Sequence, residues 1–177
     1  MAIANDTILN VVRTIYPDFE TYEHRNQLSI IVPKDKIVEV AFELKENPET
    51  SFEQLLDVTA IDWLDKKQTR FEIVYNLYSL KYASRLRLKV PVSEKDCNSP
   101  SLVSIWESAD WYERETYDMY GITFEKHPDM RRFYMPEDYK DPSSGEPIYP
   151  LRKDFPLMGV PDSLSLPPYP EKYGPTL

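Results

Sequence analysis

The sequence predicts an α+β fold: a largely antiparallel or mixed sheet of about five strands with flanking helices, followed by a long, extended, proline-rich C-terminal tail. Residues 70–80 and 84–90 alternate apolar and polar side chains, as paired strands with one covered face do. Apolar side chains recur at helical spacing in two other segments, near the N-terminus and after Pro33. The last 42 of the 177 residues hold ten of the sixteen prolines. They show neither the alternation of a strand nor the apolar spacing of a helix.

The N-terminal region predicts one helix and two short strands. Residues 6–16 are expected to form the helix, with Asp6 as its N-cap. Its apolar face consists of Ile8, Val11, Val12 and Ile15. Residues 19–24 and 27–32 favour strands that meet at a two-residue turn.

A second helix is expected after Pro33, because proline is favoured in the first turn of a helix. The apolar face of this helix consists of Ile37, Val40, Ala41 and Leu44. Ser51 and Gln54 have the spacing of a capping box, which predicts a short third helix. Residues 57–63 then favour a strand.

The C-terminal part of the body predicts a hairpin turn and two helical stretches. Residues 81–83 are expected to connect the two alternating strands. A helical stretch is expected over residues 100–106, and a longer helix over residues 109–120 with Ser108 as a possible cap. Gly121 suits the position after that helix, where a left-handed residue closes the last turn.

The change of composition at Pro136 divides the chain into an α+β domain, residues 1–135, and a tail, residues 136–177. Composition alone is compatible with a disordered tail. The tail and the residues just before it nevertheless carry many apolar anchors, which are Tyr134, Tyr139, Ile148, Tyr149, Leu151, Phe155, Leu157 and Met158. An extended segment that binds in the groove of a partner protein would need such anchors, so we expect the tail to bind a partner subunit.

Several classes of function are excluded by residues that the chain lacks. Glycine is absent from residues 1–120, so no glycine-rich phosphate-binding loop can form there. The single cysteine, Cys97, cannot hold an iron–sulfur cluster, and with His24 and His127 it does not make a usual zinc site. A formal charge of −9 without clustered lysine or arginine argues against nucleic-acid binding. No apolar run approaches the roughly 20 residues that span a bilayer, so membrane contact is expected only through a partner.

The segment from Glu113 to Arg132 combines dense charge with aromatic side chains. On the predicted helix, Arg114 is expected to reach Asp118 four residues later. Carboxylates such as those of Glu113 and Glu115 beside tyrosines are compatible with acid–base hydrolysis. A partly exposed helix with local ion pairs is the commoner reason for such a pattern.

Two short motifs follow that helix. His127-Pro128-Asp129 indicates a turn, because proline disfavours helix in the residue before it. Arg131 and Arg132 can grip a carboxylate in bidentate fashion, on this chain or on a partner. The residues alone therefore indicate an ordered, charged and aromatic surface for protein contact.

These motifs and a later stretch, residues 149–157, resemble the signature of the 30 kDa subunit of respiratory complex I, called the C subunit in bacterial NADH:quinone oxidoreductases. The resemblance extends over essentially the whole chain. We expect the signature positions to contribute to a partner interface, either directly or through contacts within the subunit. They are Glu113, Arg114, Glu115, Tyr117, Asp118, Tyr120, Gly121, His127, Pro128, Asp129, Arg131, Arg132, Arg152, Lys153, Asp154, Phe155 and Pro156.

The resemblance implies a structural or assembly subunit in the peripheral arm of a proton-translocating NADH:quinone oxidoreductase. Such a subunit packs on the 49 kDa-type subunit near the quinone module, and its tail lies across that partner. It carries no catalytic residue, cofactor or metal, since flavin and iron–sulfur centres belong to other subunits. The implied location is the cytoplasmic face of the bacterial inner membrane, held there by the complex.

Two alternatives remain. The chain is also similar to scaffold subunits of membrane-bound hydrogenases and of ferredoxin-dependent NDH-type complexes. A stand-alone hydrolase that uses Glu113, Glu115 or Asp118 is the alternative from another class.

Overall fold

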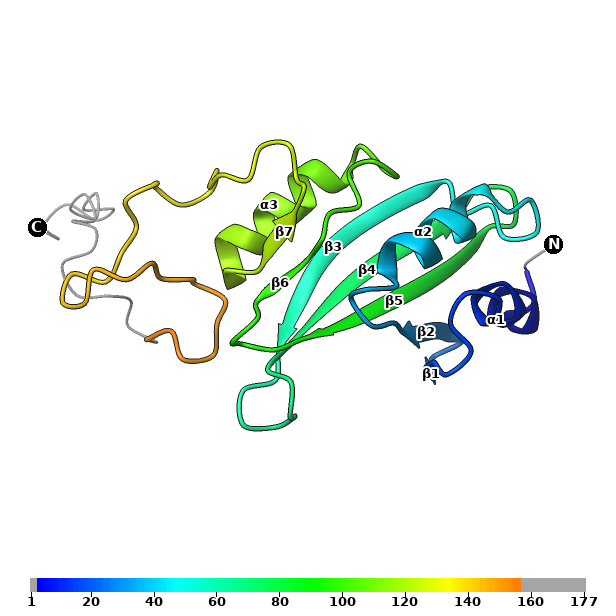
Figure 1. Cartoon of the computed structure of the whole chain (residues 1–177), viewed down its shortest axis with the longest axis horizontal. Coiled ribbons are helices and arrows are strands. Elements are labelled where there is room, and N and C mark those ends of the chain that lie inside the picture. The colour runs from blue at the N-terminus through cyan, green and yellow to red at the C-terminus, as the bar shows by residue number, and fades with distance from the viewer. Residues whose placement is uncertain (1–2, 157–177) are drawn as a thin grey trace, which may run out of the picture.

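The computed structural model describes residues 3–156, and within them it shows a five-stranded sheet, three helices and a small two-stranded sheet (Figure 1). The large sheet has the strand order β1-β2-β5-β4-β3, and every neighbouring pair is antiparallel except β2 and β5. The predicted α+β class with a mixed sheet is confirmed. The elements are α1 (Asn5–Arg13), β1 (Glu20–His24), β2 (Gln27–Ile31), α2 (Ile37–Glu46), β3 (Gln54–Asp62), β4 (Phe71–Ser79), β5 (Ser84–Val92), β6 (Asn98–Pro100), α3 (Ala109–Tyr120) and β7 (Thr123–Glu125).

The hairpin of β4 and β5 forms the middle of the sheet, as its alternating sequence predicts. One face of the hairpin is buried and contains Phe71, Ile73, Tyr75, Leu77, Leu86, Leu88, Val90 and Val92. On the other face Lys89 of β5 forms an ion pair with Glu72 of β4 at 2.7 Å. Lys67, in the connection between β3 and β4, binds the same carboxylate at 2.7 Å, so two lysines compensate the charge of Glu72.

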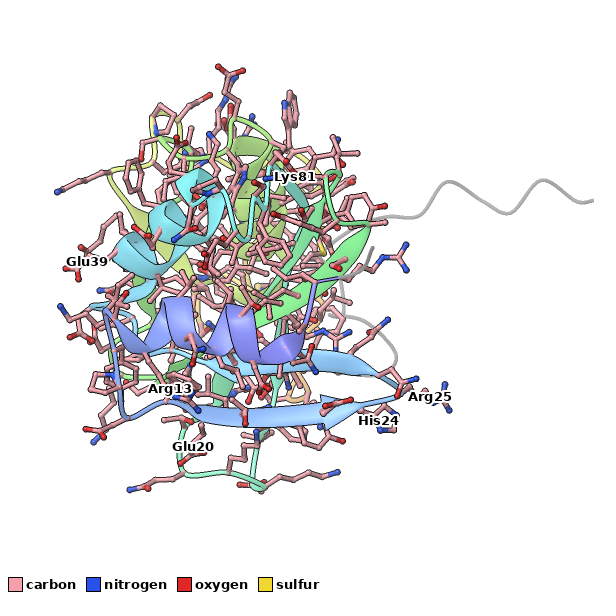
Figure 2. All side chains as sticks on the ribbon, turned by 90° about the vertical axis from the view of Figure 1, so that its right-hand side faces the viewer. Arg13, Glu20, His24, Arg25, Glu39 and Lys81 are labelled. Atoms are coloured by element: carbon pink, nitrogen blue, oxygen red, sulfur yellow. The ribbon has the colours of Figure 1, made fainter. Side chains whose placement is uncertain are left out.

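The hairpin of β1 and β2 extends the sheet on one side. Its turn consists of Arg25 and Asn26, with φ angles of 50° and 60°, the left-handed conformation that two-residue hairpins favour. All side chains of β1 are exposed, and Figure 2 shows Glu20 and His24 on this outermost strand. β1 therefore forms one edge of the sheet, and β3 forms the other.

Helices α1 and α2 pack together and contribute to the core, and Figure 1 shows α2 in front of the strands of the large sheet. The predicted apolar face of α2 is confirmed, because all four of its members are fully buried. Ile8, Val11 and Val12 of α1 are buried as predicted. Asp6 does not cap α1, so that prediction is wrong: the helix begins after Ala4, and no side chain accepts a capping hydrogen bond.

The short helix predicted at Ser51 is wrong. Ser51 lies in a turn with φ of 44°, and β3 begins at Gln54, which pairs with Tyr78. Phe52 turns into the core instead, where its backbone N–H donates to the Leu44 carbonyl at 3.0 Å and its side chain is fully buried. Burial of this ring outweighs the local capping pattern.

The helical stretch predicted over residues 100–106 is a single turn. Pro100 belongs to β6, which pairs in parallel with β7 and was not predicted. The turn is closed by the bond from the Trp106 N–H to the Leu102 carbonyl at 2.9 Å. The Trp106 indole then donates to the Phe52 carbonyl at 3.2 Å, so this turn is joined to the segment that follows α2.

Helix α3 has the predicted bounds, and Gly121 closes it in the left-handed conformation with φ of 76°. Ser108 does not cap the helix with its side chain, because its hydroxyl donates to the Leu55 carbonyl of β3 at 3.1 Å. Thr116 likewise donates to the Val58 carbonyl at 3.1 Å. These bonds place α3 against the β3 edge of the sheet.

From Lys126 onward the chain has no helix or strand within the described residues, and it runs back along α3 (Figure 1). Tyr139 is buried, and Lys140 and Pro147 form an isolated bridge. The Leu151 N–H donates to the Met119 carbonyl at the end of α3 at 3.1 Å. The predicted anchors Leu157 and Met158 lie outside the described residues. No helix in residues 3–156 is long and apolar enough to cross a membrane.

Candidate functional site

The signature residues converge around α3. The helix contributes Glu113 through Tyr120, the following loop contributes His127 through Arg132, and residues 149–156 return to the C-terminal end of the helix. Two segments that are separated in sequence therefore meet on one helix. The contacts among them determine what this region can do.

Asp118 is the best-connected carboxylate of the region. It is fully buried on α3 and forms an ion pair with Arg132 at 3.1 Å. The backbone N–H groups of Phe133, Tyr134 and Met135 also donate to it, at 3.3, 2.8 and 2.8 Å. Asp118 thus binds the loop that follows the helix, and the predicted pair between Arg114 and Asp118 is wrong because Arg132 occupies that carboxylate.

Arg132 continues this connection toward the C-terminal segment. Its side chain is 6% exposed, and its second terminal nitrogen donates to the Ile148 carbonyl at 3.1 Å. Its guanidinium also lies 5.1 Å from the ring centre of Tyr149. A single arginine therefore links α3 to residues 148 and 149.

Glu113 is equally buried but has different partners. Its carboxylate accepts hydrogen bonds from the Ser101 hydroxyl and the Leu102 N–H, both at 2.7 Å. Burial raises the pKa of Glu113 to about 7, although these two hydrogen bonds oppose the rise. Among residues 3–156 no lysine or arginine forms an ion pair with it.

Arg114 and Glu115 follow Glu113 on the helix. Burial raises the pKa of Glu115, and the charge of Asp57 raises it further. Arg114 is buried and donates through Nε to the Arg131 carbonyl at 3.3 Å. Its guanidinium lies 4.9 Å from the ring centre of Trp111 and 5.1 Å from that of Phe133.

His127 occupies a turn, as the sequence predicts. Its Nδ1 accepts the Asp129 N–H at 3.0 Å, and its Nε2 lies 3.1 Å from the Asp110 carbonyl oxygen. Pro128 and Asp129 are exposed, and Asp129 pairs with the exposed Arg131 at 2.9 Å. Of this motif, Pro128, Asp129 and Arg131 therefore present their side chains to the surface.

Gly121 lies where three signature residues come close together. A Cβ atom at this position would lie 2.5 Å from the ring of Tyr149 and 2.6 Å from an Arg152 nitrogen. Arg152 donates to the Tyr120 carbonyl at 2.6 Å and stacks on Tyr149. Tyr117 contacts the same ring edge-on, with ring centres 6.5 Å apart. Glycine is needed here both for its conformation and for the space it leaves.

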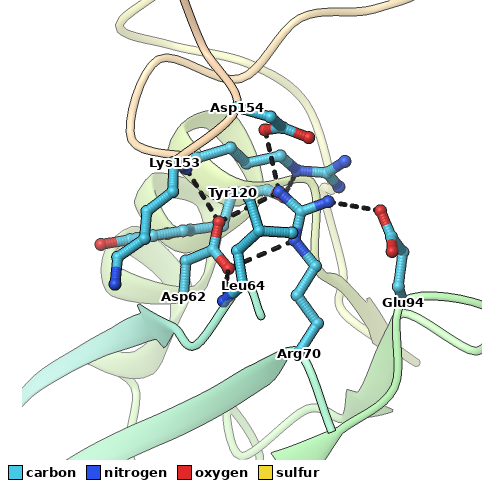
Figure 3. Close-up of polar contacts among 8 residues, drawn as sticks. Asp62, Leu64, Arg70, Glu94, Tyr120, Lys153 and Asp154 are labelled. Carbon is cyan, nitrogen blue, oxygen red and sulfur yellow. Dashed lines mark hydrogen bonds and ion pairs between the residues drawn. The ribbon is translucent and has the colours of Figure 1, made fainter. Parts of the chain in front are cut away.

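The second part of the signature joins the sheet through a cluster that we call the Arg70 cluster, formed by Asp62, Arg70, Glu94, Lys153 and Asp154 (Figure 3). Arg70 binds both oxygens of Asp62, at 3.2 and 3.0 Å, and binds Asp154 at 2.8 Å. Glu94 is its third carboxylate partner. The Lys153 N–H donates to Asp62 at 2.8 Å, so the segment around Lys153 is held by backbone as well as side-chain bonds.

The electrostatics of the Arg70 cluster follow from these contacts. Burial alone would raise the pKa of Asp62, but hydrogen bonds from Arg70, Lys153 and Leu64 outweigh it and leave this pKa below its usual value. Asp62, Arg70 and Glu94 were missed by the sequence analysis. The available signal was Asp62 on the same inward face of β3 as Val58 and Ala60, since an acid at a core position requires a partner.

The remaining signature positions are Phe155, which is half-buried, and Pro156, which is exposed. The Phe155 N–H donates to the Arg152 carbonyl at 3.1 Å, forming a turn. Among residues 3–156 no group of three histidine, cysteine, aspartate or glutamate side chains is arranged to hold a metal ion. The two most buried carboxylates of α3 are occupied by donors from this chain, so the arrangement holds chain segments together.

Comparisons with known proteins agree with this arrangement. Residues 30–161 match the family described as "Respiratory-chain NADH dehydrogenase, 30 Kd subunit". The NADH-quinone oxidoreductase C subunit of Geobacter sulfurreducens is 42% identical over 137 residues, which cover 77% of this chain and 79% of that protein. The protein of the same name from Roseiflexus sp. (strain RS-1) is 42% identical over 159 residues, which cover 89% and 87%.

Two solved structures share the fold. The trypsin-resistant fragment 1–134 of Nqo5 has a TM-score of 0.60 and 30% identity, and the match covers 70% of this chain and 98% of that one. A chain of the membrane-bound sulfane sulfur reductase, an archaeal respiratory membrane complex, has a TM-score of 0.67 and 29% identity, with 86% of each chain covered. The resemblance inferred from residues 113–132 and 149–157 is confirmed. This chain belongs to the family of the 30 kDa subunit of respiratory-chain NADH dehydrogenase.

Proposed function

We propose that this chain is a structural subunit of the peripheral arm of a proton-translocating NADH:quinone oxidoreductase, packed on the 49 kDa-type subunit near the quinone module. Relatives at 42% identity over most of the chain are named as the C subunit of NADH-quinone oxidoreductase, which supports membership of a complex I-type assembly. The oxidoreductase activity belongs to that assembly as a whole. The isolated subunit is expected to have none.

The observation that carries the structural part of this proposal is the internal pairing of the signature charges. Asp118 binds Arg132 and three backbone N–H groups, and Glu113 binds Ser101 and Leu102. A hydrolase of the glycosidase type needs two carboxylates open to substrate on either side of a bond. Carboxylates that are occupied inside the fold favour a scaffold over a hydrolase.

The proposal extends to cofactors and location. Flavin and iron–sulfur centres are proposed to reside in partner subunits, because the single Cys97 cannot ligate a cluster. The proposed location is the cytoplasmic face of the bacterial inner membrane, where the chain is held by its partners. The archaeal respiratory membrane complex that contains a structurally similar chain supports a membrane-associated assembly.

Co-purification from membranes tests this function directly. A tagged chain expressed in its native host is expected to bring down a multisubunit complex that contains iron–sulfur centres and oxidises NADH with quinone as acceptor. Recovery of a soluble monomer or homo-oligomer, with no iron and no other subunits, would overturn the proposal. The purified chain alone serves as the control for catalytic activity.

A second candidate is the equivalent scaffold of a membrane complex that does not use NADH. The match to a chain of the sulfane sulfur reductase complex, with a TM-score of 0.67, favours it specifically. The same purified complex distinguishes the two candidates. Quinone reduction with NADH supports the first, whereas electron transfer from reduced ferredoxin and not from NADH supports the second.

We also propose that the segment 136–177 binds the partner subunit. Residues 151–154 contact the domain through Met119, Tyr120, Asp62 and Arg70, so two truncations separate folding from binding. A chain ending at residue 156 is expected to keep the urea midpoint of the full chain and to bind the complex more weakly. A chain ending at residue 135 is expected to lose about 1 to 3 kcal/mol as well, because several hydrogen bonds are removed. Normal assembly of both truncations would contradict the proposal.

A further inference from the structure

Three arginine side chains of this domain are almost completely removed from solvent, and they differ in how their charge is balanced. Arg70 is surrounded by the carboxylates of Asp62, Asp154 and Glu94. Arg132 is paired with Asp118. Arg114 is 5% exposed, yet within residues 3–156 no carboxylate oxygen lies within 4.0 Å of its nitrogens.

The surroundings of Arg114 explain why it lacks a partner within the domain. The acid four residues later, Asp118, is occupied by Arg132 and by backbone donors. Arg114 makes one hydrogen bond within the described residues, from Nε to the Arg131 carbonyl at 3.3 Å. Its two terminal nitrogens, the pair that would form a bidentate contact with a carboxylate, have no partner among residues 3–156.

A cluster of aromatic side chains lies beside this guanidinium, which contacts the rings of Trp111 and Phe133. Trp111 and Tyr134 are 58% and 57% exposed, although both are large and partly apolar. Phe133 joins them, with its ring centre 5.4 Å from that of Trp111 and 4.1 Å from that of Tyr134. A largely buried arginine beside exposed tryptophan and tyrosine side chains is a composition that is enriched among the residues that dominate binding energy at protein interfaces.

We propose that Arg114 is the receptor for one aspartate or glutamate side chain of a neighbouring subunit, which enters between Trp111 and Tyr134. This inference rests on the proposed function and names the chemistry of the contact. Charge complementarity identifies the occupant: a largely buried cation whose terminal N–H groups have no partner among residues 3–156 is complementary to an anion with two acceptor oxygens. The side chains of Trp111 and Tyr134 exclude water from the ion pair, and the lower local dielectric constant strengthens the attraction between its charges.

A receptor arginine differs measurably from a residue that only supports the fold. Arg114 has no counter-ion among residues 3–156. A largely buried charge without a counter-ion costs folding free energy, and we expect this cost to be recovered when the partner carboxylate binds. Replacing Arg114 by an apolar side chain of similar length should therefore leave the isolated chain as stable as before, or more stable. The same replacement should weaken the complex.

The test compares Arg114→Met and Arg114→Lys in the full-length chain, expressed in a strain that lacks the wild-type copy. Binding is measured as the amount of chain recovered in complexes that are isolated from membranes through a tag on another peripheral-arm subunit. Arg114→Met is expected to bind about 30-fold or more weakly, the usual effect of truncating one partner of a desolvated charge pair. Arg114→Lys keeps the positive charge but lacks the two terminal nitrogens of the guanidinium. Its binding is expected to be intermediate between that of Arg114→Met and that of the wild type.

Arg13→Met is the matched control. Arg13 is an exposed arginine on α1, at the opposite end of the sheet from α3, and its guanidinium lies over the ring of Phe19 at 5.7 Å (Figures 1 and 2). This variant loses an arginine and a cation–aromatic contact but no proposed receptor. It is expected to bind within about threefold of wild type.

Each other outcome has a definite meaning. Assembly of Arg114→Met within about threefold of wild type overturns the receptor while leaving the proposed function intact. A fall in the urea midpoint of the isolated Arg114→Met chain that matches its loss of binding assigns Arg114 to the fold and also overturns the receptor.

Two acids of this chain are tested in the same way. If Asp162→Asn or Glu171→Gln causes the same loss of binding and Arg114→Met adds nothing to it, the carboxylate belongs to this chain, which overturns the partner assignment. Failure of the wild-type chain to co-purify removes the proposed function and this inference together.

Discussion

Two carboxylates of α3, Glu113 and Asp118, are both fully buried but are stabilised in different ways. Asp118 faces a cation, Arg132, and three backbone donors from the loop after the helix. Glu113 faces one hydroxyl and one backbone donor from the turn before the helix. The difference shows that burial alone does not determine the role of a signature acid, because the partners decide whether its charge stabilises the fold.

Glu113 connects α3 to the segment that precedes the helix, and Asp118 connects it to the segment that follows. Glu113 holds the turn that begins at Leu102, and Asp118 holds the loop that leads to the C-terminal segment. A charged Asp118 is compensated, whereas ionisation of Glu113 proceeds without a cation among the described residues. We therefore expect substitutions at the two positions to have opposite effects on stability at neutral or higher pH.

The largest effect is expected for Asp118→Ala. This substitution leaves Arg132 buried without its carboxylate and leaves three N–H groups without their acceptor. Loss of one partner of a buried pair costs about 3 to 5 kcal/mol, which urea unfolding of the full-length chain measures. Asp129→Ala, at an exposed pair with Arg131, is the control and should cost less than about 1 kcal/mol. Equal effects of the two substitutions would show that the Asp118 site is not specifically stabilising.

An intermediate effect is expected for Gly121→Ala, directly after the end of α3. The φ angle of 76° disfavours alanine, and the new Cβ would collide with the ring of Tyr149 at 2.5 Å. Gly145→Ala separates these two causes, because Gly145 has φ of 73° and, apart from its own chain neighbours, no described residue has an atom within 4 Å of the place where the alanine methyl group would lie. We expect roughly 2 to 4 kcal/mol at Gly121 and about 1 to 2 kcal/mol at Gly145 by urea unfolding. The same loss at both glycines would show that the packing of Tyr149 contributes nothing.

The smallest effect on stability is expected for Arg131→Glu, because the side chain of Arg131 is 63% exposed and its ion pair among residues 3–156 is with Asp129 in the adjacent turn. The free energy of unfolding should change by less than about 1 kcal/mol. Arg131 remains a predicted interface residue, and charge reversal there is expected to weaken assembly of the complex. Co-purification that is unchanged by Arg131→Glu would remove Arg131 from the interface.

The sequence predicted the parts of this fold whose cause is local. The apolar face of α2, the β4–β5 hairpin and the bounds of α3 follow from periodicities and from one helix-closing glycine. The helix predicted at Ser51 failed because capping-box spacing also occurs by chance, and burial of Phe52 decided the backbone there. Local patterns are reliable only where tertiary packing agrees with them.

The signature could be recognised from the sequence, but its contacts could not be derived from it. Arg114 was expected to pair with Asp118 on the helix, yet Asp118 forms its ion pair with Arg132, fourteen residues away. The bond between Lys153 and Asp62 joins residues separated by 91 positions. Such choices depend on which segments the fold brings together, and helical spacing carries no information about them.

The most direct test of the difference between the two acids is the pH dependence of unfolding for Glu113→Gln. The pKa of Glu113 is about 7 in the folded chain and near 4.5 when unfolded, so between these values the folded state binds more protons. Stability contributed by the neutral carboxyl is present at low pH and is lost as pH rises toward 7. Glutamine does not titrate, so the variant should gain about 2 to 3 kcal/mol relative to wild type between pH 5 and pH 8, while Asp118→Asn should be less stable than wild type at both. A difference between Glu113→Gln and wild type that stays constant over this range would contradict the account.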